Sequence, residues 1–148
     1  MVAVPQVLHH AHADTCFGAR PPVTQPVRVM FSCRADDALL IPELAGWCRD
    51  GALARCSVLL TPAQPGATAP FPHVADTDVA AAFDGLDNAV CVHERLSLEL
   101  LRAELFDMAK PLRVVVSGPE GFNAACKRML KQIDEHNLGA DAVTILSA

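Results

Sequence analysis

Residues 112–122 read LRVVVSGPEGF and join a run of β-branched residues to a glycine-proline turn. A continuous apolar run of this kind predicts a strand buried on both faces, as in a parallel sheet. Gly118 has no Cβ, so a flat ring or a phosphate could approach its backbone closely. Pro119 suits the start of a helix, whose free N–H groups attract anions. An ordinary strand–turn–helix connection explains the same residues, so the motif alone leaves both interpretations open.

The sequence after this turn predicts a helix and a last strand. An apolar stripe with helical spacing predicts the helix, and Gly139 is its expected C-terminal stop. The stripe consists of Phe122, Cys126, Met129 and Ile133. Residues 142–146 (AVTIL) are typical of a strand.

The sequence before the turn alternates between strand and helix patterns. Strands are expected at 27–32 and 54–60. Helices are expected at 2–13, 38–49 and 97–106, and at most a weak helix is expected near 78–83. Leu40, Leu44 and Trp47 are the apolar positions of the second helix, and Ser97 is the expected N-cap of the helix at 97–106. We therefore predict one α/β domain over residues 1–148, a doubly wound and mostly parallel sheet of the Rossmann-like kind. Ligands of such sheets bind at the carboxyl ends of the strands, here residues 32–37, 61–65 and 117–122.

Composition excludes several functions. The chain has 148 residues, 51% of them hydrophobic, and a formal charge of −5. Because no basic stripe is present, we expect no nucleic-acid partner. No apolar run reaches the ~20 residues of a membrane span, and no signal peptide is visible, so we expect an intracellular protein, cytoplasmic or organellar.

Cysteine and histidine patterns offer little chemistry. Six cysteines are spread along the chain without a CxxC pair, which predicts reduced, buried thiols. His9, His10 and His12 were weighed as a metal site, but neighbouring helix positions do not share a face, so we expect surface histidines and no metal. No G-x-S-x-G elbow surrounds Ser117, which argues against a hydrolase and leaves no catalytic residue to name.

Four segments, taken together, resemble the pyridine-nucleotide domain of ferredoxin-NADP reductase-like flavoenzymes, most closely the NADH-cytochrome b5 reductase branch. The turn 117–119 (SGP) resembles the "CGP" motif of that domain. The other segments are 1–11 (MVAVPQVLHHA), 29–44 (VMFSCRADDALLIPEL) and 93–105 (HERLSLELLRAEL), which follow the family's order and cover nearly the whole chain.

The resemblance implies roles for the residues of the turn. Ser117 takes the position of the motif cysteine, which lies beside the nicotinamide and helps to orient its C4 towards the flavin. Gly118 and Pro119 match the motif outright. Glu120 and Gly121 stand where the family usually has Pro or Gly followed by a hydrophobic residue, so the sequence departs from the motif there. Ser117, Gly118, Pro119, Glu120 and Phe122 are expected to bind the cofactor.

Three other residues complete the implied site. Pro5 matches the proline after the family's Gly-rich loop, and Ser32 lies in the second-strand block. Asp37 falls on an acidic position where a carboxylate accepts from ribose hydroxyls and repels a 2′-phosphate, which favours NADH over NADPH. Arg34 nearby supports the opposite choice, because an arginine can bind that phosphate.

The sequence also departs from the family. It has no tyrosine, whereas the flavin-binding barrel carries an Arg-x-Tyr-Ser/Thr motif, so FAD is expected only from a separate flavin domain. The Gly-Gly-Thr-Gly loop and the central strand before it are missing. Without that strand, the strands near 27 and 112 must pair together or leave exposed edges that invite self-association.

Two functions are therefore expected. The first is the NADH-binding domain of a flavin-dependent oxidoreductase, which positions nicotinamide for hydride transfer to FAD and onward electron transfer to an acceptor such as cytochrome b5. These residues alone are expected to be inactive. The alternative is a degenerate, non-catalytic α/β interaction module that binds no nucleotide.

Overall fold

The computed structural model describes residues 26–34, 38–62, 76–108, 112–133 and 142–147. The chain divides into two compact units, Pro26–Leu96 on the one hand and Met1–Gln25 with Ser97–Ala148 on the other. Each unit is described by itself. Every helix in the described part of the chain is too short or too polar to span a bilayer.

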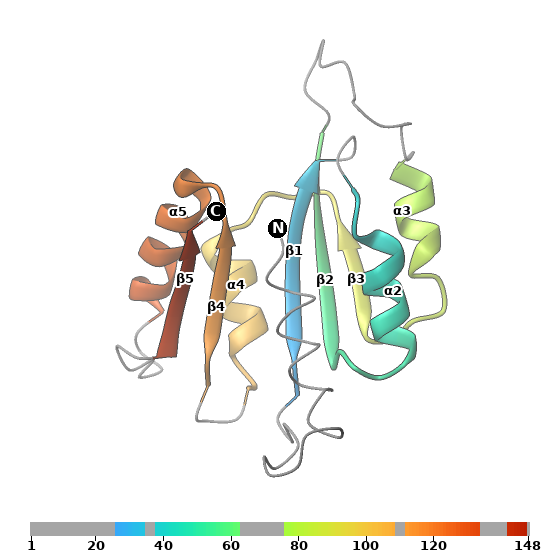
Figure 1. Cartoon of the computed structure of the whole chain (residues 1–148), viewed down its shortest axis with the longest axis horizontal. Helices are drawn as coiled ribbons and strands as arrows, with labels where there is room; N and C mark the ends of the chain where they lie inside the picture. Colours follow the sequence, from blue (N-terminus) through green and yellow to red (C-terminus); the bar gives the residue numbers. More distant parts are fainter. Residues whose placement is uncertain (1–25, 35–37, 63–75, 109–111, 134–141, 148) are drawn as a thin grey trace. The chain divides into compact units, whose positions relative to one another are not determined.

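The first unit, called the three-stranded unit, holds a parallel sheet in the order β1-β2-β3. Its strands are β1 (Arg28–Arg34), β2 (Arg55–Thr61) and β3 (Ala89–Val92), and its helices are α2 (Ile41–Arg49) and α3 (Asp76–Ala82). β2 lies between the other two strands (Figure 1). The strands expected at 27–32 and 54–60 and the helix expected at 38–49 are confirmed, and the weak helix near 78–83 begins two residues earlier.

The core of this unit lies between the sheet and α2. Along β1, Phe31 is buried and Ser32 exposed, the alternation of an outer strand, whereas central β2 is buried from Cys56 to Leu60. The side chains of Cys48 on α2 and Cys56 on β2 form a hydrogen bond, which places α2 on that face of the sheet. A guanidinium N–H of Arg49 donates to the carbonyl of Ala82, joining α2 to α3 at 3.1 Å.

The buried face of α2 differs from the predicted one. Its buried residues are Ile41, Leu44, Ala45 and Cys48. Of the three predicted apolar positions, Leu44 is buried. Leu40 is the N-cap and so precedes the helix, and Trp47 is half-buried. Small side chains such as Ala45 allow the helix to approach the sheet closely, which a search for large apolar residues overlooks.

The second unit, called the two-stranded unit, pairs β4 (Val114–Gly118) with β5 (Val143–Ser147) in parallel. Its helices are α4 (Leu98–Leu105) and α5 (Glu120–Gln132). The N-cap prediction is confirmed, because the Ser97 hydroxyl accepts a hydrogen bond from the Leu100 N–H at 3.2 Å. The strands expected at 112–117 and 142–146 are confirmed with shifts of one or two residues.

Three further expectations are corrected by the structure. β4 is not buried on both faces: Val116 is buried, but Val115 is 40% exposed. α5 ends at Gln132 with Ile133 as its C-cap, so Gly139 is not its stop. β3 was not predicted, because four residues flanked by an acidic turn give too short a pattern. The helix expected at 2–13 lies outside the described residues.

The architecture is thus α/β, with parallel strands in two small sheets. Among the described strands, β1 pairs with β2 and β4 pairs with β5, so β1 and β4 are not paired with each other. Of the two outcomes that the sequence left open for these strands, the described part of the chain shows separate sheets.

Candidate functional site

The turn between β4 and α5 carries most of the predicted site. Ser117 stands in register with Leu146, and Gly118 is the last residue of β4, in register with Ser147. Pro119 has extended backbone angles (φ −55°, ψ 153°) and is the N-cap of α5, without a side-chain capping bond. The strand, the glycine-proline turn and the helix therefore follow one another as the sequence predicts.

The helix start offers backbone donors at this turn. The first intrahelical hydrogen bond of α5 runs from the Asn123 N–H to the Pro119 carbonyl at 3.0 Å. The N–H groups of Glu120, Gly121 and Phe122 precede that bond, and they lie at the positive end of the helix dipole. Glu120 and Gly121 are exposed, so an acceptor from solution can reach this end of the helix.

Gly118 is closely covered by a side chain of its own helix. A Cβ atom built on Gly118 would lie 2.7 Å from Cδ1 of Phe122, much closer than such atoms approach in proteins. The ring of Phe122 thus occupies the space beside Gly118 that the sequence analysis assigned to a ligand ring. Glycine is required here by the Phe122 contact, whatever else binds at the turn.

Asn123 also belongs to this turn, although the sequence analysis did not single it out. Its side chain is buried, 8% exposed, and its Nδ2 donates to the carbonyls of Gly118 at 2.8 Å and Leu146 at 3.1 Å. These carbonyls come from the carboxyl ends of two neighbouring strands. A polar residue next to the apolar stripe of α5 was the available signal, but a helix-wheel reading treats such a residue as solvent-facing.

Of the other three predicted site residues, only Ser32 is among the residues that the structure describes. Ser32 is exposed on β1, in register with Leu59, and belongs to the three-stranded unit. β1 and β2 end at the same edge, where Arg34 is in register with Thr61 and the Thr61 hydroxyl donates to the Cys33 carbonyl at 3.3 Å. Pro5 and Asp37 lie outside the described residues. The structure therefore brings together Ser117, Gly118, Pro119, Glu120 and Phe122.

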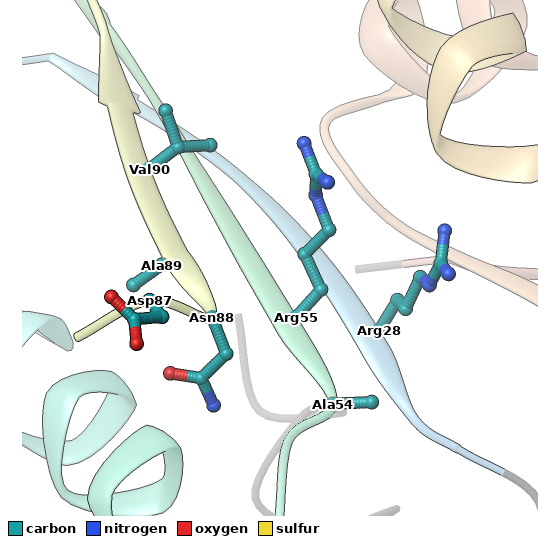
Figure 2. A pocket seen from close by; sticks show the side chains of 7 residues that line it. All are labelled: Arg28, Ala54, Arg55, Asp87, Asn88, Ala89 and Val90. Carbon is teal, nitrogen blue, oxygen red and sulfur yellow. The ribbon is translucent and has the colours of Figure 1, made fainter.

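An open hollow of about 340 Å³ lies at the opposite edge of the three-stranded sheet. Arg28 and Arg55 are register partners on neighbouring strands, and Figure 2 shows both side chains projecting from the same face. Asp87 and Asn88 line the hollow as well, and Nδ2 of Asn88 donates to the carbonyls of Cys48 and Leu53. The hollow lies at the amino ends of the strands, whereas ligands of parallel α/β sheets bind at the carboxyl ends.

The described thiols are poorly suited to catalysis. Cys33, Cys48, Cys56, Cys91 and Cys126 are thiols that form no disulfide, and Cys91 alone among these five is not buried. Burial raises the pKa of the Cys48 thiol, which the hydrogen bond to Cys56 and the charge of Arg49 partly offset, and burial likewise raises the pKa of Cys126. Within the described residues, no three metal-ligating side chains come together, and the three N-terminal histidines lie outside them.

Comparisons with known proteins add no identification, since no protein-family model, curated protein or solved structure matches the chain. The candidate site therefore rests on its own residues: a parallel strand, a closely packed glycine, an uncapped helix start and a buried asparagine.

Proposed function

We propose that the chain is the NADH-binding part of a flavin-dependent oxidoreductase, similar to the nucleotide domain of cytochrome b5 reductases. The finer fold proposed with it is a doubly wound, Rossmann-like sheet. The observation that carries the proposal is the turn at 117–119, where a parallel strand ends at Gly118 and α5 begins directly after Pro119. The resemblance of this turn and three other segments to the family supports the same assignment.

The residues at the turn fit a pyridine nucleotide, with one condition. Ser117 is partly exposed at the end of β4 and can hydrogen-bond a carboxamide, and the first N–H groups of α5 can donate hydrogen bonds to an anionic or carbonyl oxygen. The condition concerns Phe122, whose ring must turn aside or stack on the nicotinamide before a ligand ring reaches Gly118.

The work of this chain is to bind and orient the nucleotide. A bound reduced nicotinamide would supply a hydride to a flavin held by another domain, and an acceptor such as cytochrome b5 would take the electrons one at a time. Ser117 and the turn at Gly118 would hold the nicotinamide ring in the direction that this transfer needs.

The choice of nucleotide rests on two charged residues, Arg34 and Asp37, which stand three positions apart in the sequence. Asp37 favours NADH, because its carboxylate repels a 2′-phosphate. Arg34, the last residue of β1, favours the opposite choice. We assign NADH on the match of Asp37 to the family's acidic position.

Titration of the full chain with NADH and NADPH tests this assignment. Nucleotide fluorescence and quenching of Trp47, the single tryptophan, report binding. We expect saturable NADH binding that Ser117→Tyr abolishes, because a large side chain at the end of β4 blocks the approach to the turn, and that Asp37→Ala weakens relative to NADPH. Thr144→Tyr is the control, because Thr144 is exposed on β5 before its carboxyl end. Binding that survives Ser117→Tyr unchanged contradicts the site.

One observation favours the alternative of an interaction module without nucleotide. The ring of Phe122 already packs on Gly118, so the turn is complete without a ligand. A folded chain that binds neither nucleotide supports this second function and rejects the first.

A further inference from the structure

Asn123 holds the candidate turn from two sides. Its backbone N–H donates to the Pro119 carbonyl at 3.0 Å, and its side-chain Nδ2 donates to the neighbouring Gly118 carbonyl at 2.8 Å. One residue therefore orients two consecutive peptide groups of the turn. The second bond from Nδ2, to the Leu146 carbonyl at 3.1 Å, ties this turn to the end of β5.

Few other described interactions constrain the turn. The β4–β5 ladder runs out at Gly118 and Ser147, and Pro119 contributes neither an N–H group nor a side-chain cap. Phe122 packs on Gly118 but leaves the direction of the peptide groups open. The carboxamide of Asn123 is thus the polar group that determines how Ser117 and the start of α5 face one another.

The asparagine is also costly to the fold. Its Oδ1 atom is buried and has no hydrogen-bond partner among the residues that the structure describes. An unsatisfied buried acceptor is destabilising, and a leucine of similar size would avoid it. A group of this kind in a native structure calls for an explanation beyond packing.

We propose that Asn123 is a positioning residue of the nucleotide site, whose carboxamide keeps the turn at 117–119 in its binding shape. This inference rests on the proposed function. Asn123 acts through the backbone of Gly118 and Pro119 and does not itself touch the nucleotide.

Two substitutions separate positioning from support of the fold. Asn123→Leu removes both side-chain bonds at nearly constant size. Asn123→Asp replaces the donor with a carboxylate that faces two carbonyl oxygens, and burial raises its pKa. When protonated, that carboxyl donates one hydrogen bond again. The charged residues of α5 are Glu120, Lys127, Arg128 and Lys131, and those of α4, which packs on α5, are Glu99, Arg102 and Glu104; β4 and β5 carry no charged residue.

The chain supplies its own matched control. Asn88 in the three-stranded unit also donates from Nδ2 to two carbonyls, those of Cys48 and Leu53, at 3.1 and 2.9 Å. Asn88→Leu and Asn88→Asp therefore remove the same kind of link away from the candidate turn. NADH affinity is measured by fluorescence for the full chain and all four variants, with circular dichroism to confirm that each is folded.

The expected result is a loss of NADH affinity of about tenfold in Asn123→Leu, the equivalent of one to two hydrogen bonds, and no change in the Asn88 variants. Asn123→Asp is expected to regain affinity as the pH falls from about 8 to about 6, a rise that the unaltered chain does not show. If Asn123→Leu does not fold, the pH series of Asn123→Asp decides. Equal affinity in folded Asn123 variants and the unaltered chain overturns the inference alone. An unaltered chain that binds no NADH overturns the proposed function and this inference with it.

Discussion

The three-stranded and two-stranded units use the same side chain in different surroundings. Asn88 is half-buried and links the end of α2 to the residues before β2. Asn123 is buried and links the ends of two strands, and its Oδ1 atom receives no hydrogen bond from the described residues. The first asparagine completes a loop, whereas the second sits under a strand end where ligands of parallel sheets bind.

The hydrophobic cores of the two units also differ, and the larger described core belongs to the three-stranded unit. Most of the buried hydrophobic side chains among the described residues belong to the three-stranded unit, where Leu44, Val58 and Val79 have no exposed surface. In the described part of the two-stranded unit, the buried hydrophobic residues are Val116, Cys126, Leu130 and Ile133. Stability is thus expected to depend mainly on the three-stranded unit, whereas the candidate turn belongs to the unit with the smaller core, as when functional regions have few apolar contacts.

The largest effect is expected from leucine truncation in the two cores. Leu44→Ala should lower the free energy of unfolding by about 3–4 kcal/mol, because the side chain is fully enclosed. Leu130→Ala should cost about 2 kcal/mol, because a smaller core can relax around the lost atoms. Urea titrations followed by Trp47 fluorescence report the three-stranded unit, and circular dichroism reports both. An equal or larger loss in Leu130→Ala would contradict the comparison.

Two glycine substitutions, one in each unit, are expected to give the next largest changes in stability. Gly118→Ala places a Cβ at 2.7 Å from Phe122 and should destabilise the chain by about 1–3 kcal/mol. Gly46→Ala, inside α2 with open space around it, should stabilise by about 0.5–1 kcal/mol through helix propensity. Thermal unfolding measures both.

The cause of the Gly118 effect can be checked separately. In a Phe122→Ala background the clash is gone, so adding Gly118→Ala should then cost little. A loss of the same size in both backgrounds would show that the ring contact is not the reason for glycine at this position.

Most of the element pattern was predictable because it depends on local sequence. Val114–Val116 and the run ending at Leu60 are β-branched or aliphatic, and Ser97 caps its helix through a bond three residues away. These signals act within one turn or one strand. The end of α5 was predicted wrongly at Gly139, although the apolar stripe, which reaches Ile133, marks the observed end at Gln132 to within one residue.

The candidate site was predictable in part. The turn at Gly118 follows from glycine and proline chemistry, but the packing of Phe122 on that glycine and the bonds of Asn123 to Gly118 and Leu146 depend on how α5 lies against β4 and β5. Likewise, Arg28 and Arg55 became neighbours only through the register of β1 with β2. Pairing between strands is long-range information that residue patterns do not contain.

The smallest expected effect concerns the thiols, which behave alike in both units. Burial raises the pKa of Cys48 and of Cys126 above the ordinary value of 9.0, so the unfolded chain loses these protons at lower pH than the folded chain. The protonated thiols therefore make their full contribution to the free energy of unfolding below pH 9. This contribution is lost as the pH rises through the pKa values of the two thiols in the folded chain. Half-buried Cys91 should react with iodoacetamide before either of them.

Peptide mapping of the alkylated chain with time measures the order of reaction, and urea titrations above pH 9 measure the decline. Cys48→Ala and Cys126→Ala should each make the alkaline decline shallower. If Cys126 reacts as fast as Cys91 while Cys48 stays protected, α5 opens from its sheet more readily than α2 does, and the smaller core of the two-stranded unit is the physical reason. Equal protection of the two buried thiols would mean instead that the units open together, and that the difference between their cores does not set their dynamics.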